Sequence, residues 1–253
     1  MFHQRAQMNH FHIDQQTFND LQIFSANGQS SIFDVFKGTR TLGGRTMLRE
    51  MMHKPYCSLA EVTLRRDAIK YFRDAKITLE FKNEEIDLIE FYLKFDKRRS
   101  RSNIIDSVAD YFTRNSSNDF YIIKVGLKYL IKLVKQLTTL IEEYGPGASG
   151  TIHHTFEKMQ EIMQQGIFQY TAQLNENKLN FMQVNKLDQA FRGKQKENVR
   201  MLLDMVYELD IFENLALIST KLNLSFADYD SSDKMKVSLK GLFHLTMAQP
   251  VKN

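Results

Sequence analysis

Residues 41–55 read Thr41-Leu-Gly-Gly-Arg-Thr-Met-Leu-Arg-Glu-Met-Met-His-Lys-Pro55, so that two glycines open a helical pattern and a proline closes it. Glycine lowers helix stability, so a pair of glycines in the first turn is costly unless another helix must approach closely. We therefore predict that Gly43 lies at a helix start pressed against a neighbouring helix, where a β-carbon would collide.

The composition is that of an ordinary globular protein. Of the 253 residues, 43% are hydrophobic and 25% are charged, and the three prolines and eleven glycines are few enough to favour long helices. The formal net charge of +4 is too small to indicate nucleic-acid binding by itself. A single cysteine, Cys57, excludes a disulfide framework and fits a reducing compartment. The N-terminus lacks the apolar core of a signal peptide, and no uncharged stretch is long enough to span a membrane, so we expect a cytoplasmic protein without a membrane partner.

The hydrophobic pattern predicts an all-α fold. Residues 30–95 read as short packed helices, and Ser58-Leu-Ala-Glu61 has the form of a capping box. Two coiled-coil seams with alternating spacings of four and three residues follow, separated by a glycine-rich turn at residues 145–150. This arrangement predicts a long antiparallel lever-helix hairpin. The seam residues are Ile123, Leu127, Leu130, Val134, Leu137 and Ile141 in the first arm, and Ile152, Phe156, Met159, Met163, Gly166 and Tyr170 in the second.

The rest of the chain is less regular. Residues 195–222 predict another strong helix, residues 175–194 have no clear period and could be partly extended, and residues 236–243 alternate like a strand. We therefore expect three parts: a helical core sub-bundle over residues 1–115, lever helices over residues 116–222, and a short β-prone tail over residues 223–253 that leads into a further domain.

Five short motifs, in a fixed order, carry a family resemblance. Residues 12–23 match four positions of the pattern Asp-x-x-Thr-x-x-Asn-Leu-Glu-Ile, and residues 41–55 match a Thr-x-Gly-x-Arg-x-Leu pattern that ends in proline but lack its tryptophan. Residues 62–69 and 209–216 match Arg-x-Asp-Ala and Leu-Asp-x-x-x-x-Leu-Ala, and residues 241–244 match Gly-Arg-His-Pro in part. The motif residues singled out are Asp14, Thr17, Thr41, Gly43, Gly44, Arg45, Pro55, Arg65, Asp67 and Asp210. Together they resemble the core and lever domain of the MutS family, the DNA mismatch-repair ATPases.

The resemblance implies a mechanical, non-catalytic role. In this family, ATP binding in a C-terminal domain changes the angle of the lever helices, which carry the change to the DNA-binding end. The resemblance implies ATP and Mg²⁺ as cofactors of a longer parent protein, with none in this chain. It also implies three partners: the C-terminal ATPase domain of the same polypeptide, a second copy bound through that domain, and DNA, held weakly by this part of the chain.

Other family features are missing from the sequence. The DNA clamp and the mismatch-reading Phe-x-Glu motif have no counterpart, although residues 175–194 leave open a reduced clamp. The phosphate-binding motif Gly-x-x-x-x-Gly-Lys-Ser/Thr is also absent, and the similar spacing of Gly38 and Gly43 is better explained by a helix start. We therefore expect the chain to be part of a longer ATPase.

The sequence predicts no catalytic, cofactor-binding or metal-binding residues. The basic run Lys97, Arg98, Arg99 and Arg101 could contact DNA phosphates, although such runs are more often solvated loops. Arg45 is expected to tie the core helices to the lever base through carboxylates or helix-end carbonyls. As the alternative function, the chain is a helical scaffold whose 145–150 turn, which has no lysine or arginine, docks a protein partner unrelated to mismatch recognition.

Overall fold

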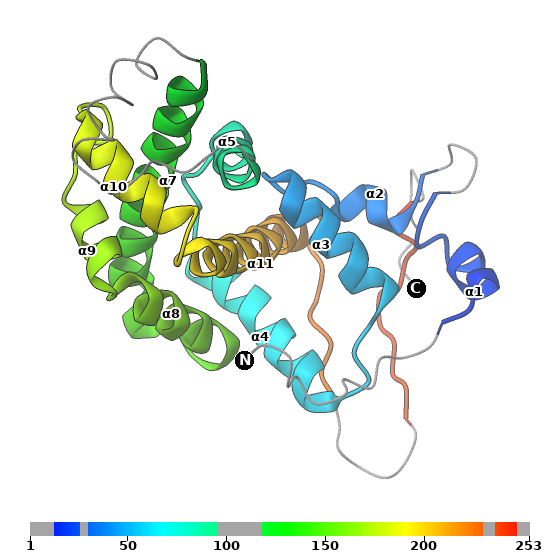
Figure 1. The fold of residues 1–253 in the computed structure, drawn as a ribbon. Helices are drawn as coiled ribbons and strands as arrows, with labels where there is room; N and C mark the ends of the chain where they lie inside the picture. The colour runs from blue at the N-terminus through cyan, green and yellow to red at the C-terminus, as the bar shows by residue number, and fades with distance from the viewer. Residues whose placement is uncertain (1–12, 26–29, 96–117, 230–235, 247–253) are drawn as a thin grey trace. The chain divides into compact units, whose positions relative to one another are not determined.

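The computed structural model of the chain describes residues 13–25, 30–95, 118–229 and 236–246 (Figure 1). Helices make up 69% of these described residues and no strand or sheet occurs among them, which confirms the all-α prediction. The chain divides into two compact units: unit 1 comprises residues 1–77 and 208–253, and unit 2 comprises residues 78–207. The boundaries predicted at residues 115 and 222 divide the chain by expected function and not by compact unit. They remain a prediction. None of the described helices combines the length and the apolar character needed to cross a membrane.

Three of the described helices of unit 1, the first three in the sequence, begin at polar residues whose side chains cap them. Asp14 accepts a hydrogen bond from the Thr17 amide at 2.7 Å and starts the first helix, while Ser31 and Asp34 form a capping box that starts the second. These helices are α1 (Gln15–Asp20), α2 (Ile32–Phe36), α3 (Leu42–His53), α4 (Leu59–Asp74) and the part of α11 (Lys196–Lys221) from residue 208 onward.

The start of α4 differs from the prediction in one detail. The helix begins after Ser58 as expected, but the Ser58 side chain makes no capping hydrogen bond, so the predicted capping box is wrong. Ser58 is exposed, and its neighbouring amides can be satisfied by water. Glu61 lies in the first turn, where a carboxylate is favoured by the partial positive charge of the helix N-terminus.

The core of unit 1 forms where α2, α3 and α11 meet. Phe33, Leu48 and Ile211 are buried together, and partly buried apolar side chains from these elements and from Phe24, which precedes α2, pack against them. On another side of α11, the rings of Phe72 from α4 and Phe212 pack with their centroids 6.0 Å apart. The second half of α11 is therefore the element on which the unit 1 helices assemble.

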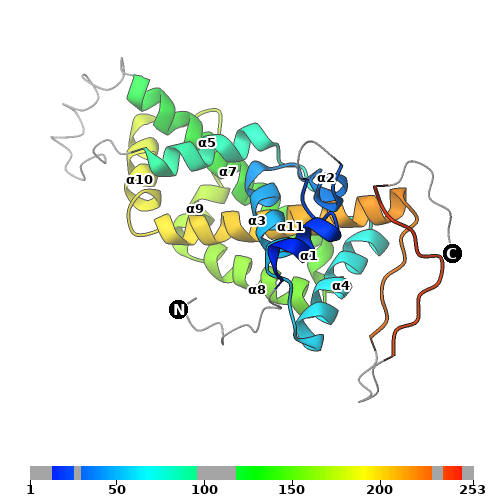
Figure 2. The same cartoon turned by 90° about the vertical axis from the view of Figure 1, so that its right-hand side faces the viewer.

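Unit 2 is built around α7. This helix packs against α5, α8, α9 and α10, which surround it in Figure 1 and again in Figure 2. All six residues of the first predicted seam are buried. The described elements of unit 2 are α5 (Asn83–Lys94), α7 (Asn118–Tyr144), the 3₁₀ turn η2 (Gly145–Gly147), α8 (Gly150–Met163), α9 (Gly166–Ala172), α10 (Phe181–Phe191) and the part of α11 up to residue 207.

The second predicted seam is interrupted. Its first three residues are buried in α8, but α8 ends at Met163 and a separate helix, α9, begins at Gly166. Gln165 between them is extended, with φ −65° and ψ 136°, and Gly166 is a poor helix former. The turn after α7 thus lies where the sequence predicts it, whereas the arm that follows is two short helices rather than one long one.

Two less regular segments are now placed. Residues 181–191 form α10, and Asn180 and Gln183 make a capping box at its start, so this part of 175–194 is helical. Residues 236–246 form no strand despite their alternating pattern, and Val237, Leu239 and Leu242 are exposed. An isolated extended segment has no partner for its backbone hydrogen bonds, so alternation alone does not make a strand.

Candidate functional site

A cluster of buried polar side chains joins the start of α3 to α11 within unit 1. The carboxylate of Asp210, on α11, accepts hydrogen bonds from the Thr41 hydroxyl at 2.6 Å, the Thr41 amide at 2.8 Å and the Arg40 amide at 2.8 Å. Asp210 and Thr41 are almost fully buried. Because these bonds satisfy donors that have no partner inside the helix, the carboxylate of one helix completes the N-terminus of another.

Thr41 makes this junction possible because its hydroxyl bonds both to its own helix and to α11. Its backbone is extended, with φ −103° and ψ 150°, which ends the preceding segment and starts α3. Its hydroxyl accepts a hydrogen bond from the Gly44 amide at 2.9 Å and donates its proton to Asp210. A residue with one donor and two acceptor positions at this site therefore caps its own helix and binds α11.

The close helix approach that the sequence assigns to Gly43 is made by Gly44. A β-carbon on Gly44 would lie 2.6 Å from Asp210 Oδ2 and 2.9 Å from Thr41 Oγ1, closer than real β-carbons come to such atoms. Gly44 is buried, whereas Gly43 is only half-buried. One glycine of this pair is thus pressed against α11, and that glycine is Gly44.

A charged pair next to the junction was not predicted. Arg40 donates from Nε and Nη2 to the two carboxylate oxygens of Glu213, each at 2.6 Å, and the Glu213 side chain is 2% exposed. On the same face of α11, the Asn214 side-chain amide donates to the Phe36 carbonyl at the end of α2. No local pattern reveals these contacts, because the partners lie more than 170 residues apart in the sequence.

The role expected of Arg45 is divided between two arginines. Arg45 Nε donates to the Lys37 carbonyl at the end of α2, at 3.2 Å, which is one of the two kinds of contact predicted for it. Arg45 is exposed, and the described contact with an α11 carboxylate belongs to Arg40 instead. Arg40 is the better placed of the two because it directly precedes the helix start that meets α11.

In the junction, burial and hydrogen bonding shift the pKa of Asp210 in opposite directions. Burial raises the pKa of Asp210, the bonds from Thr41 and the Arg40 amide lower it, and the neighbouring Glu213 raises it further, with a net rise. The hydrogen bond to Glu213 raises the pKa of Arg40. At neutral pH, Arg40 and the N-terminus of α3 face the two carboxylates, an arrangement that holds two helices together.

The same geometry bears on nucleotide binding. The amides of Arg40, Thr41 and Gly44 are the donors that a phosphate would need at the start of α3, and Asp210 and the Thr41 hydroxyl already bind them. A phosphate there would also meet the carboxylates of Asp210 and Glu213. A phosphate at this helix start would therefore have to displace the Asp210 carboxylate from the Arg40 and Thr41 amides.

The remaining motif residues have structural positions. Asp14 caps α1 and Thr17 supplies the amide that it binds. Pro55 directly follows the end of α3 and is half-buried. The Arg65 guanidinium lies 4.0 Å from the centre of the Tyr56 ring, and Asp67 is paired with Arg66. The basic run Lys97, Arg98, Arg99 and Arg101 lies outside the described residues.

Unit 2 contains a second buried polar contact. The Arg192 guanidinium forms two hydrogen bonds with the Asp188 carboxylate, at 2.5 and 2.6 Å, and a third with the Phe95 carbonyl at 2.9 Å. Asp188 and Arg192 are one turn apart on α10, and both side chains are almost fully buried. The pair fastens the end of α5 to the end of α10, and its position was not evident from the sequence.

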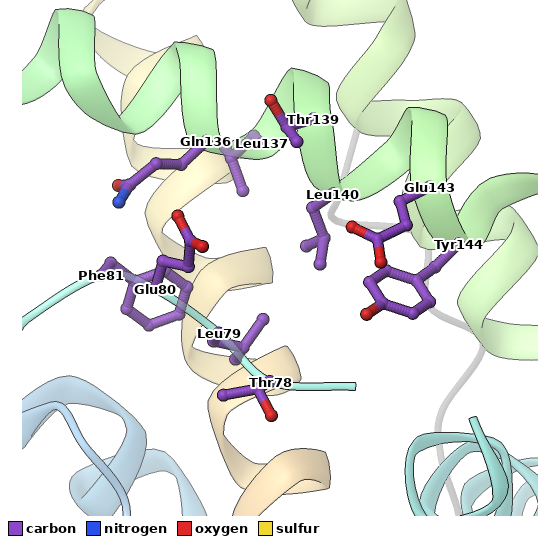
Figure 3. A pocket seen from close by; sticks show the side chains of 10 residues that line it. All are labelled: Thr78, Leu79, Glu80, Phe81, Gln136, Leu137, Thr139, Leu140, Glu143 and Tyr144. Carbon is purple, nitrogen blue, oxygen red and sulfur yellow. The ribbon is translucent and has the colours of Figure 1, made fainter. Parts of the chain in front are cut away.

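A groove in unit 2 lies between the extended residues 78–81 and the C-terminal half of α7 (Figure 3). It encloses about 420 Å³, open solvent included. Leu79, Leu137 and Leu140 form its apolar part and are buried, while its two acidic side chains, Glu80 and Glu143, are exposed. In the described part of the chain, no cluster of His, Cys, Asp or Glu side chains could hold a metal ion.

Comparison with known proteins gives one family. The family model described as MutS domain III matches residues 16–216, a span that includes the Thr41–Asp210 junction and all of unit 2. No curated protein matches the chain.

Proposed function

Because this chain belongs to the MutS family, as its core domain III, we propose that it couples the nucleotide state of an adjoining ATPase domain to a DNA-binding or partner-binding end. Domain III of MutS is a non-catalytic domain, so the proposed role is mechanical. In this proposal ATP and Mg²⁺ bind to the adjoining domain of the same polypeptide, a second copy binds through that domain, and DNA contacts this chain only weakly.

The observation that carries the proposal is the fastening of α3 to α11. Asp210, Glu213 and Asn214 are spaced three and four residues apart, so they share one face of α11. They bind the Thr41 hydroxyl and amide, the Arg40 side chain and the Phe36 carbonyl. Within unit 1, residues 208–221 of α11 form a continuous helix about 21 Å long. A shift of this face of α11 must therefore carry the start of α3 with it or break buried hydrogen bonds.

The test is a pair of substitutions at Thr41 in the polypeptide that also carries the ATPase domain. Thr41→Val keeps the shape but removes the hydroxyl, and Thr41→Ser keeps the hydroxyl as the matched control. We expect Thr41→Val to keep ATP hydrolysis but to weaken the effect of ATP on the rate of DNA dissociation, while Thr41→Ser behaves like the wild type. An ATP effect on DNA dissociation that is equal in all three proteins would contradict the proposed coupling.

The exposed tail supports the proposed contact with the ATPase domain. Val237 and Leu239 are 76% and 65% exposed, and large apolar side chains exposed together are typical of an interaction surface. Hydrogen exchange of residues 236–246 should slow when the adjoining domain is present. Unchanged exchange would show that the tail is not part of the interface.

A second candidate function is docking of a protein partner at the turn after α7. Glu142 and Glu143 are exposed next to η2, and the turn has no lysine or arginine. An acidic tip repels the DNA backbone and suits a basic protein surface. Duplex DNA should therefore leave the hydrogen exchange of residues 142–150 unchanged. Protection of these residues by DNA would exclude this alternative and favour a direct DNA contact.

A further inference from the structure

Helix α4 carries the same two-residue unit twice. Arg66-Asp67 and Arg73-Asp74 are seven residues apart, which is close to two helical turns, so both arginines lie on one face. In each unit the guanidinium is paired with the carboxylate of the next residue, at 2.8 Å for Asp67 and 3.1 Å for Asp74. The carboxylate binds the edge of the guanidinium and leaves its flat face available for stacking.

The segment that follows α11 contacts both units. The Arg73 guanidinium lies 4.5 Å from the centre of the Phe226 ring, and the Arg66 guanidinium lies 5.7 Å from that of Tyr229. Arg66 also donates a hydrogen bond to the Ala227 carbonyl at 3.1 Å. Figure 1 and Figure 2 both show this orange segment descending from the end of α11 beside α4. All of these residues belong to unit 1.

The distance between the two arginines along α4 agrees with the distance between Phe226 and Tyr229 along the segment. Seven residues of α-helix rise about 10.5 Å, and three residues of extended chain, from Phe226 to Tyr229, span about 10 Å. The later residue of the segment contacts the earlier arginine, so the segment runs antiparallel to α4. Both stacking contacts can therefore form together only while the segment is extended and in one register.

We propose that residues 222–229 are a strap that holds the end of α11 to α4 in a fixed register set by the two Arg–Asp units. This inference deepens the proposed function and rests on it for its purpose: the strap gives α4 a direct link to the chain that continues beyond Tyr229. It also assigns a task to the family-motif residue Asp67, which orients Arg66 rather than contacting DNA. The arginines are positioning residues, because they act through the strap.

Limited chymotrypsin digestion of the 253-residue chain tests the strap, since the enzyme should cleave after Phe226 more readily when this segment is released from α4. The variants are Arg66→Ala and Arg73→Ala, with Lys70→Ala as the control, because Lys70 lies between the two arginines on the same face of α4 but makes neither of the two cation–π contacts with the strap. Loss of one cation–π contact at an exposed site corresponds to a rise of about two- to five-fold in the open population. We expect this rise in cleavage after Phe226 for both arginine variants and none for Lys70→Ala. The expectation includes Arg66→Ala, although Arg66 contacts Tyr229 and not Phe226.

A variant that shifts the register of the strap provides a second test, in case an arginine substitution also disturbs α4. One glycine inserted after Ala227 moves Tyr229 by about 3.3 Å along an extended chain, so that only one stacking contact can form. It should raise cleavage after Phe226 as the arginine variants do. Unchanged cleavage in Arg66→Ala or in the insertion variant, or an equal rise in Lys70→Ala, would overturn the strap. The digestion uses neither nucleotide nor DNA, so its failure is distinct from a failure of the Thr41 experiment.

Discussion

Oδ2 of Asp210 accepts hydrogen bonds from both the hydroxyl and the amide of Thr41, at 2.6 and 2.8 Å, across 169 residues of sequence. Because Thr41 also caps α3, one residue fixes both where this helix begins and which part of α11 it meets. The junction is buried, so its donors have no access to water if the carboxylate is removed.

Gly44 should tolerate no side chain, whereas Gly43 should. The β-carbon of Gly44→Ala would lie 2.6 Å from the Asp210 carboxylate, so we expect a loss of about 1–3 kcal/mol in the free energy of unfolding. Gly43→Ala lies in the same turn and should gain up to about 1 kcal/mol from helix propensity. Urea denaturation measures both. Equal effects of the two substitutions would contradict the assignment of the close contact to Gly44.

Gly126 should be essential for the packing of α5 on α7. A β-carbon there would lie 2.3 Å from Cβ of Tyr92 and 2.5 Å from its Cγ, and Tyr92 is fully buried. Gly126→Ala should therefore destabilise unit 2 by about 3 kcal/mol through overpacking. Gly166→Ala is the matched control, because nothing lies within 4 Å of the added atom. Thermal melting that shows no difference between these two variants would contradict this packing.

Breaking the buried pair of Asp188 and Arg192 should destabilise the fold strongly, whereas replacing both residues by apolar ones should destabilise it little. Arg192→Met removes the cation that neutralises the buried Asp188 carboxylate, and we expect a loss of about 3–5 kcal/mol in the free energy of unfolding. Adding Asp188→Leu to this variant removes the buried negative charge and should recover most of that loss. If the double variant were less stable than Arg192→Met, the loss of stability in Arg192→Met would not come from breaking the pair.

Protonation of Asp34 should contribute to the loss of stability in acid. Hydrogen bonds from Lys37 and Ser31 lower the pKa of Asp34 from 3.8 to about 2. A lowered pKa means that the ionised form favours the folded state, so the contribution is complete above about pH 4 and is lost as the pH falls through about 2. Asp34→Asn should therefore show a shallower loss of stability over this interval, measured by denaturation at several pH values. Parallel losses in the wild type and the variant would contradict the shift.

Local signals predicted part of the described fold. Thr41 caps α3 where the predicted helical pattern begins, and the six residues of the first seam are buried in α7, because caps and periodicity act over a few residues. The capping box of Asn180 and Gln183 would have revealed α10 in the same way. The break between α8 and α9 was missed because Gly166 fits the seam spacing although it is a weak helix former.

Long-range contacts could not be predicted from the sequence. The pair of Arg40 and Glu213 depends on how α11 crosses the start of α3, and no pattern of nearby residues encodes that crossing. The same crossing decides that Gly44 rather than Gly43 faces Asp210. The motifs placed Thr41 and Asp210 among the important residues, but only the fold shows that they bind each other.

A double-mutant cycle on Thr41→Val and Asp210→Asn measures the central contact most directly. Free energies of unfolding of the wild type, the two single variants and the double variant give the coupling energy of the pair. The account predicts that the two losses are strongly non-additive, with a coupling of about 1–3 kcal/mol, because both substitutions break the same buried hydrogen bond. Losses that add within about 0.5 kcal/mol would contradict it, since α3 and α11 would then be held together without this junction.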